Sequence, residues 1–408
     1  MKYSIKYLLF SGLFALFVFP VHADEDGKNM FNPLTTGVTT LGIAPDARGG
    51  SMGDLGVATD PDVNSQYWNP SKYAFAYSSA GVSVSYTPWL RKLVNDINLA
   101  YVAGYWKFGG NDLQALSASL RYFSLGSVPT YDNNGVLQNT VNPYEMAIDL
   151  GYSRKLSSSF SMGVVFRFIY SDMGFGGLSS AEDMSGGTAA DSSGYQTVYP
   201  IIGRSECQFS WGFNISNIGS KVSYDGGTNS AFLPTNLRLG FSFLFPIYDY
   251  NTLSINFDAN KLLVPAAPRQ SDYTYEDEYG NTQYDTEAYN RAKDKFNNTG
   301  SISGIFKSFS DAPGGFKEEL REIYFSTGLE YSYNRRFFVR AGYYYENKYK
   351  GNRQYATFGA GFSLNVFSLD AAYVLATAQS SPLDQTMRFT LSFDMDGIKD
   401  LIGRKRRR

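Results

Sequence analysis

The sequence predicts an all-β protein: a 14-stranded antiparallel transmembrane β-barrel of an outer membrane, with an N-terminal plug segment. Three observations lead to this prediction. The chain opens with a secretory signal, continues with many short segments in which apolar and polar residues alternate, and has no later apolar stretch long enough for a membrane helix. A helical span needs about 20 consecutive apolar residues, whereas a barrel strand needs only about ten that alternate.

The amino terminus has the organisation of a secretory signal peptide. Lys2 and Lys6 precede an apolar core over residues 8–20, and Ala23 is a small residue at the expected cleavage site. The core is too short to anchor the chain as a membrane helix, and no cysteine near the cut indicates a lipid anchor. We therefore expect the signal to be removed after Ala23.

Removal of the signal leaves few of the side chains that enzymes use. His22 is the only histidine and leaves with the signal, so a mature chain has no imidazole for a Ser-His-Asp site or a histidine-ligated metal. Cys207 is the only cysteine, so no intramolecular disulfide can form. We expect no catalytic residues, no cofactor, no metal and no nucleic-acid partner.

The alternating segments define two faces of a wall. Over residues 160–168 every second residue is large and apolar, and Ser161, Gly163 and Arg167 lie between them. In a membrane barrel the apolar set faces lipid, whereas in a soluble β-sandwich it would face inward; the signal and the aromatic strand ends favour the barrel. The charged residues predicted to face the lumen are Arg121, Asp149, Arg167, Arg238, Asp258, Glu330, Arg340, Arg388 and Asp394.

The connections predict which end of the barrel lies outside the cell. Short turns at 109–111, 156–159, 333–336 and 364–367 are typical of the periplasmic end, and the long segments 125–143, 172–205 and 264–321 are expected to be extracellular. An even strand count then requires one further strand, which we place at residues 221–224. Both termini are expected in the periplasm. The predicted units are a signal peptide (1–23), a plug (24–79), a barrel (80–396) and a basic tail (397–408).

The segment before the first strand is rich in glycine and contains Trp68, Asn69 and Pro70 in succession. A segment of this size can fold back into a barrel as a plug. The lumen-facing charges have mixed signs, so we expect them to pair with one another and with the plug. These charges either only hydrate or stabilise the lumen, or have a role in transport. The basic tail is most simply a solvated run of charge, with attraction to anionic lipid as the alternative.

The longest insertion, residues 264–321, interleaves aromatic residues with acidic ones. Aromatic side chains of this kind are enriched where proteins touch, although a solvated acidic loop would have the same composition. The acidic triplet at 276–278 does not have the EF-hand spacing, so no metal is assigned. The residues predicted to bind a partner are Tyr273, Tyr275, Tyr284, Tyr289, Phe306, Phe309 and Phe316.

Two stretches resemble known families. Residues 35–75, including Trp68-Asn69-Pro70-Ser71, resemble the N-terminal region of the FadL-like transporters, in which alanine is usual where Ser71 stands here. The segments 86–90, 261–265, 351–353, 359–361, 382–384 and 388–391 resemble the PorV (LptO) family of the type IX secretion system, in order along nearly the whole chain. Barrels usually stop on an aromatic residue, whereas this chain continues from Phe393 into a basic tail.

The resemblance implies a carrier without enzymatic activity. PorV-like proteins take the C-terminal signal domains of secreted proteins from the translocon, a SprA- or Sov-like subunit, to an attachment complex that contains the PorU sortase. The resemblance therefore implies these three kinds of partner, together with the lipid of the outer membrane. The alternative is a FadL-like channel for hydrophobic small molecules, which the charged lumen disfavours. A lipid-modifying enzyme would lack the histidine that such hydrolases commonly use.

Overall fold

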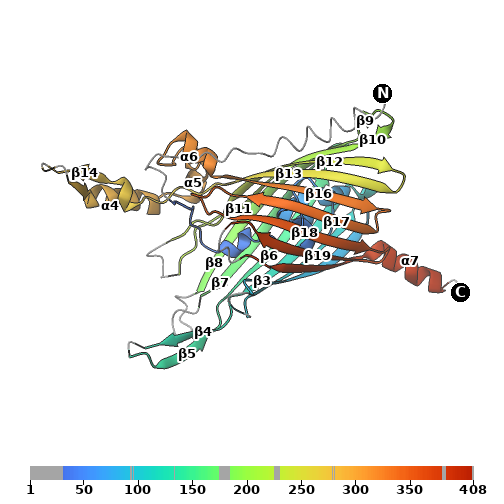
Figure 1. The fold of residues 1–408 in the computed structure, drawn as a ribbon. Helices are drawn as coiled ribbons and strands as arrows, with labels where there is room; N and C mark the ends of the chain where they lie inside the picture. Colours follow the sequence, from blue (N-terminus) through green and yellow to red (C-terminus); the bar gives the residue numbers. More distant parts are fainter. Residues whose placement is uncertain are drawn as a thin grey trace.

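The computed structural model describes residues 31–91, 94, 96–132, 134–173, 184–224, 230–277, 279, 281–378 and 383–406. Cleavage after Ala23 and the start of the plug lie outside these residues. Fourteen antiparallel strands of the described chain close into one barrel, in which each strand pairs with the next and the last pairs with the first (Figure 1). The strands are β1 (Ala80–Pro88), β2 (Asn98–Phe108), β3 (Gln114–Ser124), β6 (Tyr144–Lys155), β7 (Phe160–Asp172), β8 (Met184–Val198), β11 (Gln208–Gly219), β12 (Asn236–Tyr248), β13 (Asn251–Leu262), β16 (Ile323–Tyr333), β17 (Phe337–Tyr345), β18 (Gln354–Ser363), β19 (Phe367–Ala376) and β20 (Met387–Asp394).

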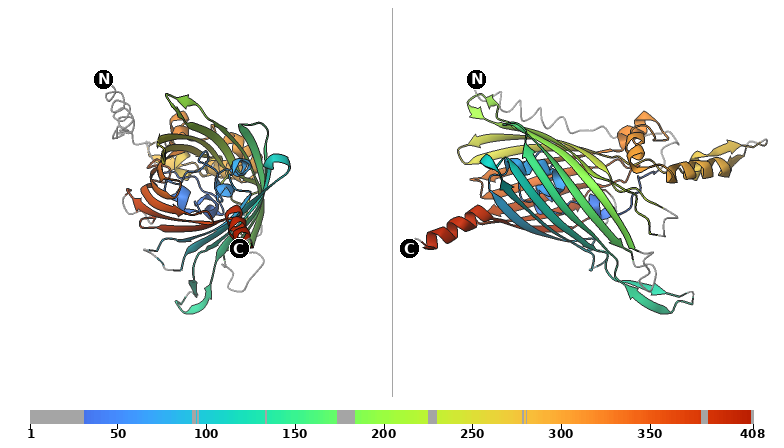
Figure 2. Two further views of the ribbon diagram at one scale, coloured as in Figure 1. Left: turned by 90° about the vertical axis from the view of Figure 1, so that its right-hand side faces the viewer. Right: turned by 180° about the vertical axis from the view of Figure 1, so that it is seen from behind.

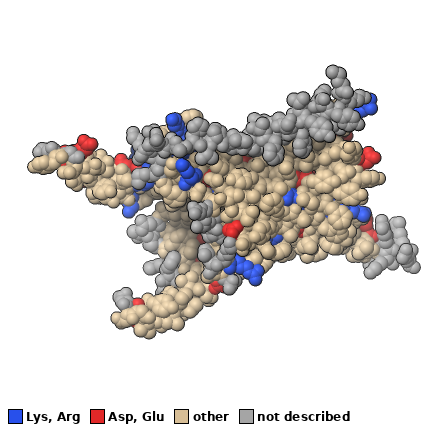
Figure 3. Space-filling view, in the orientation of Figure 1, with Lys and Arg blue, Asp and Glu red and all other residues tan. Residues whose placement is uncertain are grey.

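The wall of the barrel has an apolar outer face and a polar inner face. On β7, Phe166 is 56% exposed while its neighbour Arg167 is 5% exposed; on β20, Leu391 is 37% exposed and Arg388 is 2% exposed. The middle of the wall in Figure 3 is almost free of charged side chains. A water-soluble protein does not expose an apolar surface of this extent, so the barrel is a membrane barrel of the outer-membrane type.

The fourteenth strand is not where the sequence predicted it. The segment 172–205, expected to be one extracellular loop, contains the 15-residue strand β8. The outward side chains of β8 are small or polar, among them Gly186, Thr188, Ala190 and Ser192, so apolar alternation is absent. A large neighbour covers this strand from outside at one position: a Cβ added to Gly194 would lie 2.4 Å from the Phe213 ring.

Residues 221–224, predicted as the missing strand, do not belong to the barrel. They fold inward and make one isolated bridge, between Val222 and Ala231. Val222 is buried against Val38 and Leu41 of the N-terminal segment. Contact with the plug therefore fixes this segment, and strand pairing does not.

The two ends of the barrel differ. At one end, here called the turn end, β1 begins, β20 ends, and the turns at 109–113, 156–159, 249–250, 334–336 and 364–366 join the strands. The hairpin of β9 (Ile201–Ile202) and β10 (Ser205–Glu206) also lies there (Figure 1), so residues 201–205 of the predicted extracellular loop lie at the turn end. The other end, the loop end, has the hairpin of β4 (Val128–Tyr131) and β5 (Leu137–Val141) and the longest insertion.

The longest insertion forms a projecting arm and a base. The arm consists of η5 (Gln270–Asp272), the hairpin of β14 (Thr274–Glu276) and β15 (Thr282–Tyr284), and α4 (Thr286–Asn297). The base consists of α5 (Ser301–Lys307) and α6 (Phe316–Arg321). Figure 1 and Figure 2 show the arm standing clear of the barrel while the base lies at its rim.

The N-terminal segment lies inside the barrel (Figure 2). Its short helices are η2 (Thr39–Gly42), α2 (Ala47–Gly50), α3 (Ser65–Trp68) and η3 (Pro70–Phe75). It lies directly against the wall at Gly328 and Gly342, which face each other on β16 and β17. A Cβ on Gly328 or Gly342 would lie 2.6 or 2.1 Å from atoms of Met52, so these positions admit the plug only because they lack side chains.

The barrel continues into a C-terminal helix, α7 (Met395–Arg406), which the sequence did not predict. Asp394 accepts hydrogen bonds from the backbone of Asp396 at 2.9 Å and of Gly397 at 3.0 Å, which caps the start of the helix. Ser79, just before β1, donates to Asp396 from its hydroxyl at 2.5 Å and from its backbone at 2.6 Å; these bonds lower the pKa of Asp396 to about 2. In the described residues no helix is both long and apolar enough to cross a membrane.

Candidate functional site

The Trp68 side chain contacts several turns of the plug. Its indole N–H donates to a carboxylate oxygen of Asp46 at 2.7 Å. The ring lies directly against Gly49 and Gly56, where an added Cβ would come within 2.4 and 2.5 Å of it. Two of the glycines in this segment, Gly49 and Gly56, therefore make room for the indole.

Asn69 and Pro70 connect the same turns to the wall. The Asn69 side-chain amide donates to the carbonyls of Val57 in the plug and Gly194 on β8, both at 2.9 Å. Pro70 occupies the first position of η3, where a helix needs no backbone N–H. The Ser71 hydroxyl donates to the Asn69 side-chain oxygen, a bond that alanine could not make.

A chain of buried ion pairs links the plug to three wall strands. Arg48 of the plug donates to Glu330 on β16 at 3.0 Å. Arg340 on β17 donates to Glu330 and to Asp370 on β19, both at 2.6 Å. Asp62 of the plug accepts from Arg48 at 2.9 Å. The sequence predicted Glu330 and Arg340 as lumen-facing but identified none of their partners.

The last strand holds the plug through Arg388. Its guanidinium donates to both carboxylate oxygens of Asp54, and the Tyr355 hydroxyl donates to Asp54 at 2.7 Å. Asp54 has a left-handed backbone conformation with φ 58°, in which a non-glycine residue is uncommon. Its position in a turn of the plug could not be inferred from alternation.

Two further arginines reach the plug through its backbone and an aromatic ring. Arg121 donates to the carbonyls of Thr40 at 2.6 Å and Ile43 at 3.0 Å. Arg238 donates to the carbonyl of Tyr67 at 3.1 Å and to its hydroxyl at 3.0 Å, and its guanidinium lies 4.5 Å from the ring centre. Both wall cations thus hydrogen-bond to backbone oxygens of the irregular plug.

The remaining lumen-facing candidates have other roles. Arg167 pairs with Asp149 at 2.7 Å and with Asp191 at 3.1 Å, so it links wall strands to one another. Asp258 accepts two backbone N–H groups of the plug at 2.8 and 3.1 Å. Asp394 lies at the rim, where it caps α7. The structure therefore brings Arg121, Arg238, Asp258, Glu330 and Arg388 into direct contact with the plug.

A cavity of about 550 Å³ opens at the loop end, above the plug. Its lining is amphipathic: the rings of Tyr344 and Tyr355 stack with centres 4.7 Å apart, and Arg238, Arg353 and Glu346 add charge. Arg353 donates to Glu346 at 2.8 Å. This mouth has space for a peptide segment or a small molecule with both apolar and charged groups.

The predicted partner-binding aromatics fall into two groups. Tyr273 and Tyr289 are half-buried and contact each other, with ring centres 6.1 Å apart, so they hold the hairpin against α4. Five others are exposed, by 50–77%. The exposed aromatics are Tyr275, Tyr284, Phe306, Phe309 and Phe316.

The base of the insertion is fixed to the barrel by charge. Lys261 on β13 donates to Glu319 at 3.0 Å and to Glu322 at 2.6 Å, and Lys350, between β17 and β18, donates to Glu322 at 3.0 Å. Nearby, Asp311 accepts the backbone N–H of Ala266 at 2.9 Å. Burial raises the pKa of Asp311 to about 6.

The described residues contain no group of three or more histidine, cysteine, aspartate or glutamate side chains that could hold a metal ion. Cys207 is buried. The described side chains at the loop end provide aromatic surface, hydrogen-bonding groups and charge.

None of the curated proteins compared with the chain matches it. Similar solved structures include the TodX deltaS2S3 mutant monoaromatic hydrocarbon channel (TM-score 0.47, 12% identity, covering 86% of this chain and 98% of that one). They also include the Pseudomonas putida toluene transporter TodX (0.45, 11%, 89% and 98%) and a Pseudomonas aeruginosa FadL homologue (0.42, 13%, 89% and 99%).

Residues 25–269, more than half of the 408-residue chain, match the family described as "Type IX secretion system protein PorV". The match covers the plug and the first nine strands of the barrel. It confirms the family predicted from short segments of the sequence, and the chain belongs to the PorV family of type IX secretion system proteins.

Proposed function

We propose that the protein is a non-enzymatic docking subunit of type IX secretion. It binds the C-terminal signal domains of secreted proteins at the loop end. It carries them from a SprA- or Sov-like translocon subunit to the attachment complex that contains the PorU sortase. The loop end faces the cell exterior, and both termini face the periplasm.

The observation that supports this proposal most is the contrast between the lumen and the loop end. The lumen holds a plug attached to β16 and β20 through Arg48 and Asp54. A channel for hydrophobic molecules would have to break buried ion pairs of this kind, at a cost of about 3–5 kcal/mol for each unpaired charge. The exposed aromatics, in contrast, are free to meet a partner without rearrangement of the barrel.

Large exposed aromatic side chains favour a protein partner. Tyr275 and Tyr284 belong to a hairpin whose strand residues are all exposed, and Phe306 and Phe316 are 73% and 77% exposed at the base. Aromatic anchors supply much of the binding energy at protein interfaces. Lys261 holds the base to the rim of the barrel. A cargo protein bound to the base would therefore move together with the barrel.

The test replaces the five exposed aromatics by serine and leaves Tyr273 and Tyr289 in place. The variant protein should reach the membrane as a heat-resistant barrel. A secreted protein with a C-terminal signal domain should no longer co-purify with it, and cargo attached to the cell surface should fall. The control is Tyr131→Ser in the β4–β5 hairpin, where Tyr131 is 61% exposed at the same end.

One result would contradict the location of the docking surface, and another would contradict the docking function itself. Normal co-purification with the five-residue variant would place the docking surface in the mouth or in the shorter loops. If no signal-domain protein co-purifies even with the unaltered chain, while a hydrophobic small molecule crosses membranes that contain it, the channel replaces the docking proposal.

A further inference from the structure

The seam between the first and last strands is open at the loop end. The pairing of β1 with β20 ends at Tyr86 and Phe389, although β1 continues to Pro88 along β2 and β20 begins at Met387 along β19. Pro88 has no N–H to donate to a ladder. Pro88 therefore limits the hydrogen bonding between β1 and β20, and the seam ends before the two strands end.

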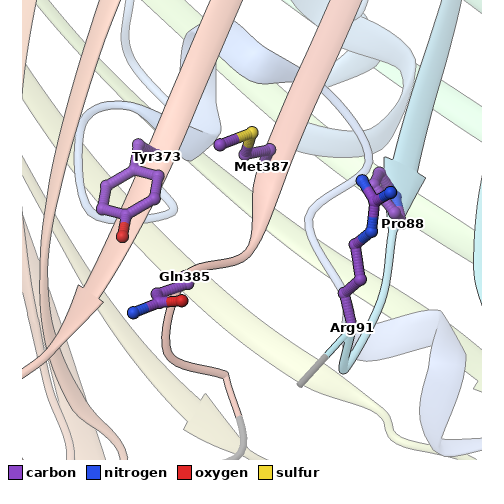
Figure 4. A pocket seen from close by; sticks show the side chains of 5 residues that line it. All are labelled: Pro88, Arg91, Tyr373, Gln385 and Met387. Atoms are coloured by element: carbon purple, nitrogen blue, oxygen red, sulfur yellow. The ribbon is translucent and has the colours of Figure 1, made fainter. Parts of the chain in front are cut away.

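A pocket of about 240 Å³ occupies this opening, lined by Pro88, Arg91, Tyr373, Gln385 and Met387 (Figure 4). Alternation places it on the outer face of the wall. Pro88 follows the outward set of β1, Met387 is 44% exposed ahead of outward Phe389, and Tyr373 lies on the outward side of β19. The pocket is thus continuous with the surface that meets lipid.

The lining is divided between an apolar floor and a polar rim. Pro88 and Met387 provide carbon and sulfur, whereas Arg91, Gln385 and the Tyr373 hydroxyl provide hydrogen-bond donors. Within the described residues Arg91 has no ion-pair partner and is exposed. Asp384, beside Gln385, accepts the backbone N–H of Ala376 at 3.0 Å, so its carboxylate is already engaged.

The position suits a lipid better than a soluble ligand. Tyr86 and Phe389, at the last paired rung, are 49% and 44% exposed, and aromatic residues of this kind mark the boundary between hydrocarbon and head groups. The pocket lies one step beyond them toward the loop end. At this position Arg91 lies at the depth of the lipid phosphates, and Met387 lies at the depth at which the acyl chains begin.

We propose that this seam pocket binds a phosphate-bearing lipid of the leaflet at the loop end. Arg91, Gln385 and the Tyr373 hydroxyl hold the phosphate, and the acyl chain lies on Met387 and the outer face of β20. The lipid fills the gap that the shortened seam leaves in the wall. This inference is independent of the cargo proposal, which concerns the arm and the base of the insertion.

The test uses native mass spectrometry of the purified full-length protein in detergent with added lipid A. The unaltered protein should retain lipid A, and should retain dephosphorylated lipid A far less. Arg91→Ala should weaken retention about tenfold, the usual value of one charge-assisted hydrogen bond, and Tyr373→Phe should weaken it less. Arg291→Ala is the matched control, because Arg291 is an exposed arginine of the arm.

Folding of each variant is checked by its heat-modifiable migration. Equal retention of lipid A by Arg91→Ala and the unaltered protein would overturn the proposal. So would equal retention of the phosphorylated and dephosphorylated lipids, which would leave only an apolar groove. Binding of inorganic phosphate as tightly as lipid A would also overturn it, because the apolar floor would then contribute nothing.

Discussion

Arg388, on the strand that closes the barrel, donates two hydrogen bonds to Asp54, in a turn of the segment that fills it. The two residues are 334 positions apart in the chain. Their contact couples the closure of the barrel to the position of the plug.

Asp54→Ala should destabilise the barrel strongly. It removes the carboxylate that compensates Arg388 and leaves a buried cation, which costs about 3–5 kcal/mol. Urea unfolding in detergent, followed by the change in migration, measures the loss. The double variant Asp54→Ala with Arg388→Met should recover part of it, since no charge is then left unpaired. Additive losses would mean that the two side chains do not interact.

Phe166→Arg should impair membrane assembly. It places a charge on the outer face of β7, which costs about 2–4 kcal/mol at the bilayer midplane. Quantitative blotting of heat-resistant protein in outer-membrane fractions measures assembly. Phe166→Leu keeps the face apolar and should assemble normally. If the arginine variant assembles equally well, Phe166 does not face hydrocarbon.

Gly342→Ala should loosen the plug. The added Cβ would lie 2.1 Å from the backbone of Met52, and forced overpacking typically costs about 1–3 kcal/mol. Thermal unfolding in detergent is the measurement. The control is Gly110→Ala in a turn, where the added Cβ meets nothing within 4 Å. Equal melting temperatures for the two variants would show that the plug does not press on β17.

The base of the insertion should become more stable as the pH falls from about 7 toward 5. Burial raises the pKa of Asp311 to about 6. The folded state therefore binds more protons than the unfolded state between the ordinary pKa of an aspartate and this value, and stability decreases as pH rises through that window. Proteolytic cleavage within residues 264–322 should be slower, relative to Asp311→Asn, at pH 5.5 than at 7.5. A constant ratio of the two cleavage rates would contradict the assignment.

A tag inserted near Asn298, between the arm and the base, should be labelled on intact cells. The reason is that the long connections share one end of the barrel and the short turns the other. A tag inserted in the turn at 249–250 should be labelled only after the outer membrane is opened. The reverse pattern would invert the proposed topology.

Periodicity predicted the barrel and most of its strands, because membrane strands of this chain repeat large apolar residues at every second position. It failed at β8, where Gly186, Thr188, Ala190 and Ser192 occupy outward positions that other strands fill with large apolar residues. It also misplaced a strand at 221–224, whose Val222 is buried by the plug instead of by lipid. Local patterns do not report contacts made across the lumen.

Among the candidate residues, those on strands could be predicted from the sequence and those in the plug could not. The predicted faces of Arg167 and Arg388 followed from alternation alone. Asp370 also lies on an inward position of β19 and could have been found in the same way. Arg48, Asp54 and Asp62 could not, since the plug has no repeating geometry and each residue is positioned by a tertiary partner. The helix α7 was hidden by the charges of the tail.

The pairing of Asp54 with Arg388 also has a consequence for biogenesis. The plug is synthesised before any strand, yet one of its anchors lies on the last. A chain released before residue 388 would hold its plug without that anchor, and its wall would lack both the seam and the cap that Ser79 and Asp396 form at the start of α7. Only the finished polypeptide can therefore both close the cylinder and hold its amino-terminal segment through Arg388.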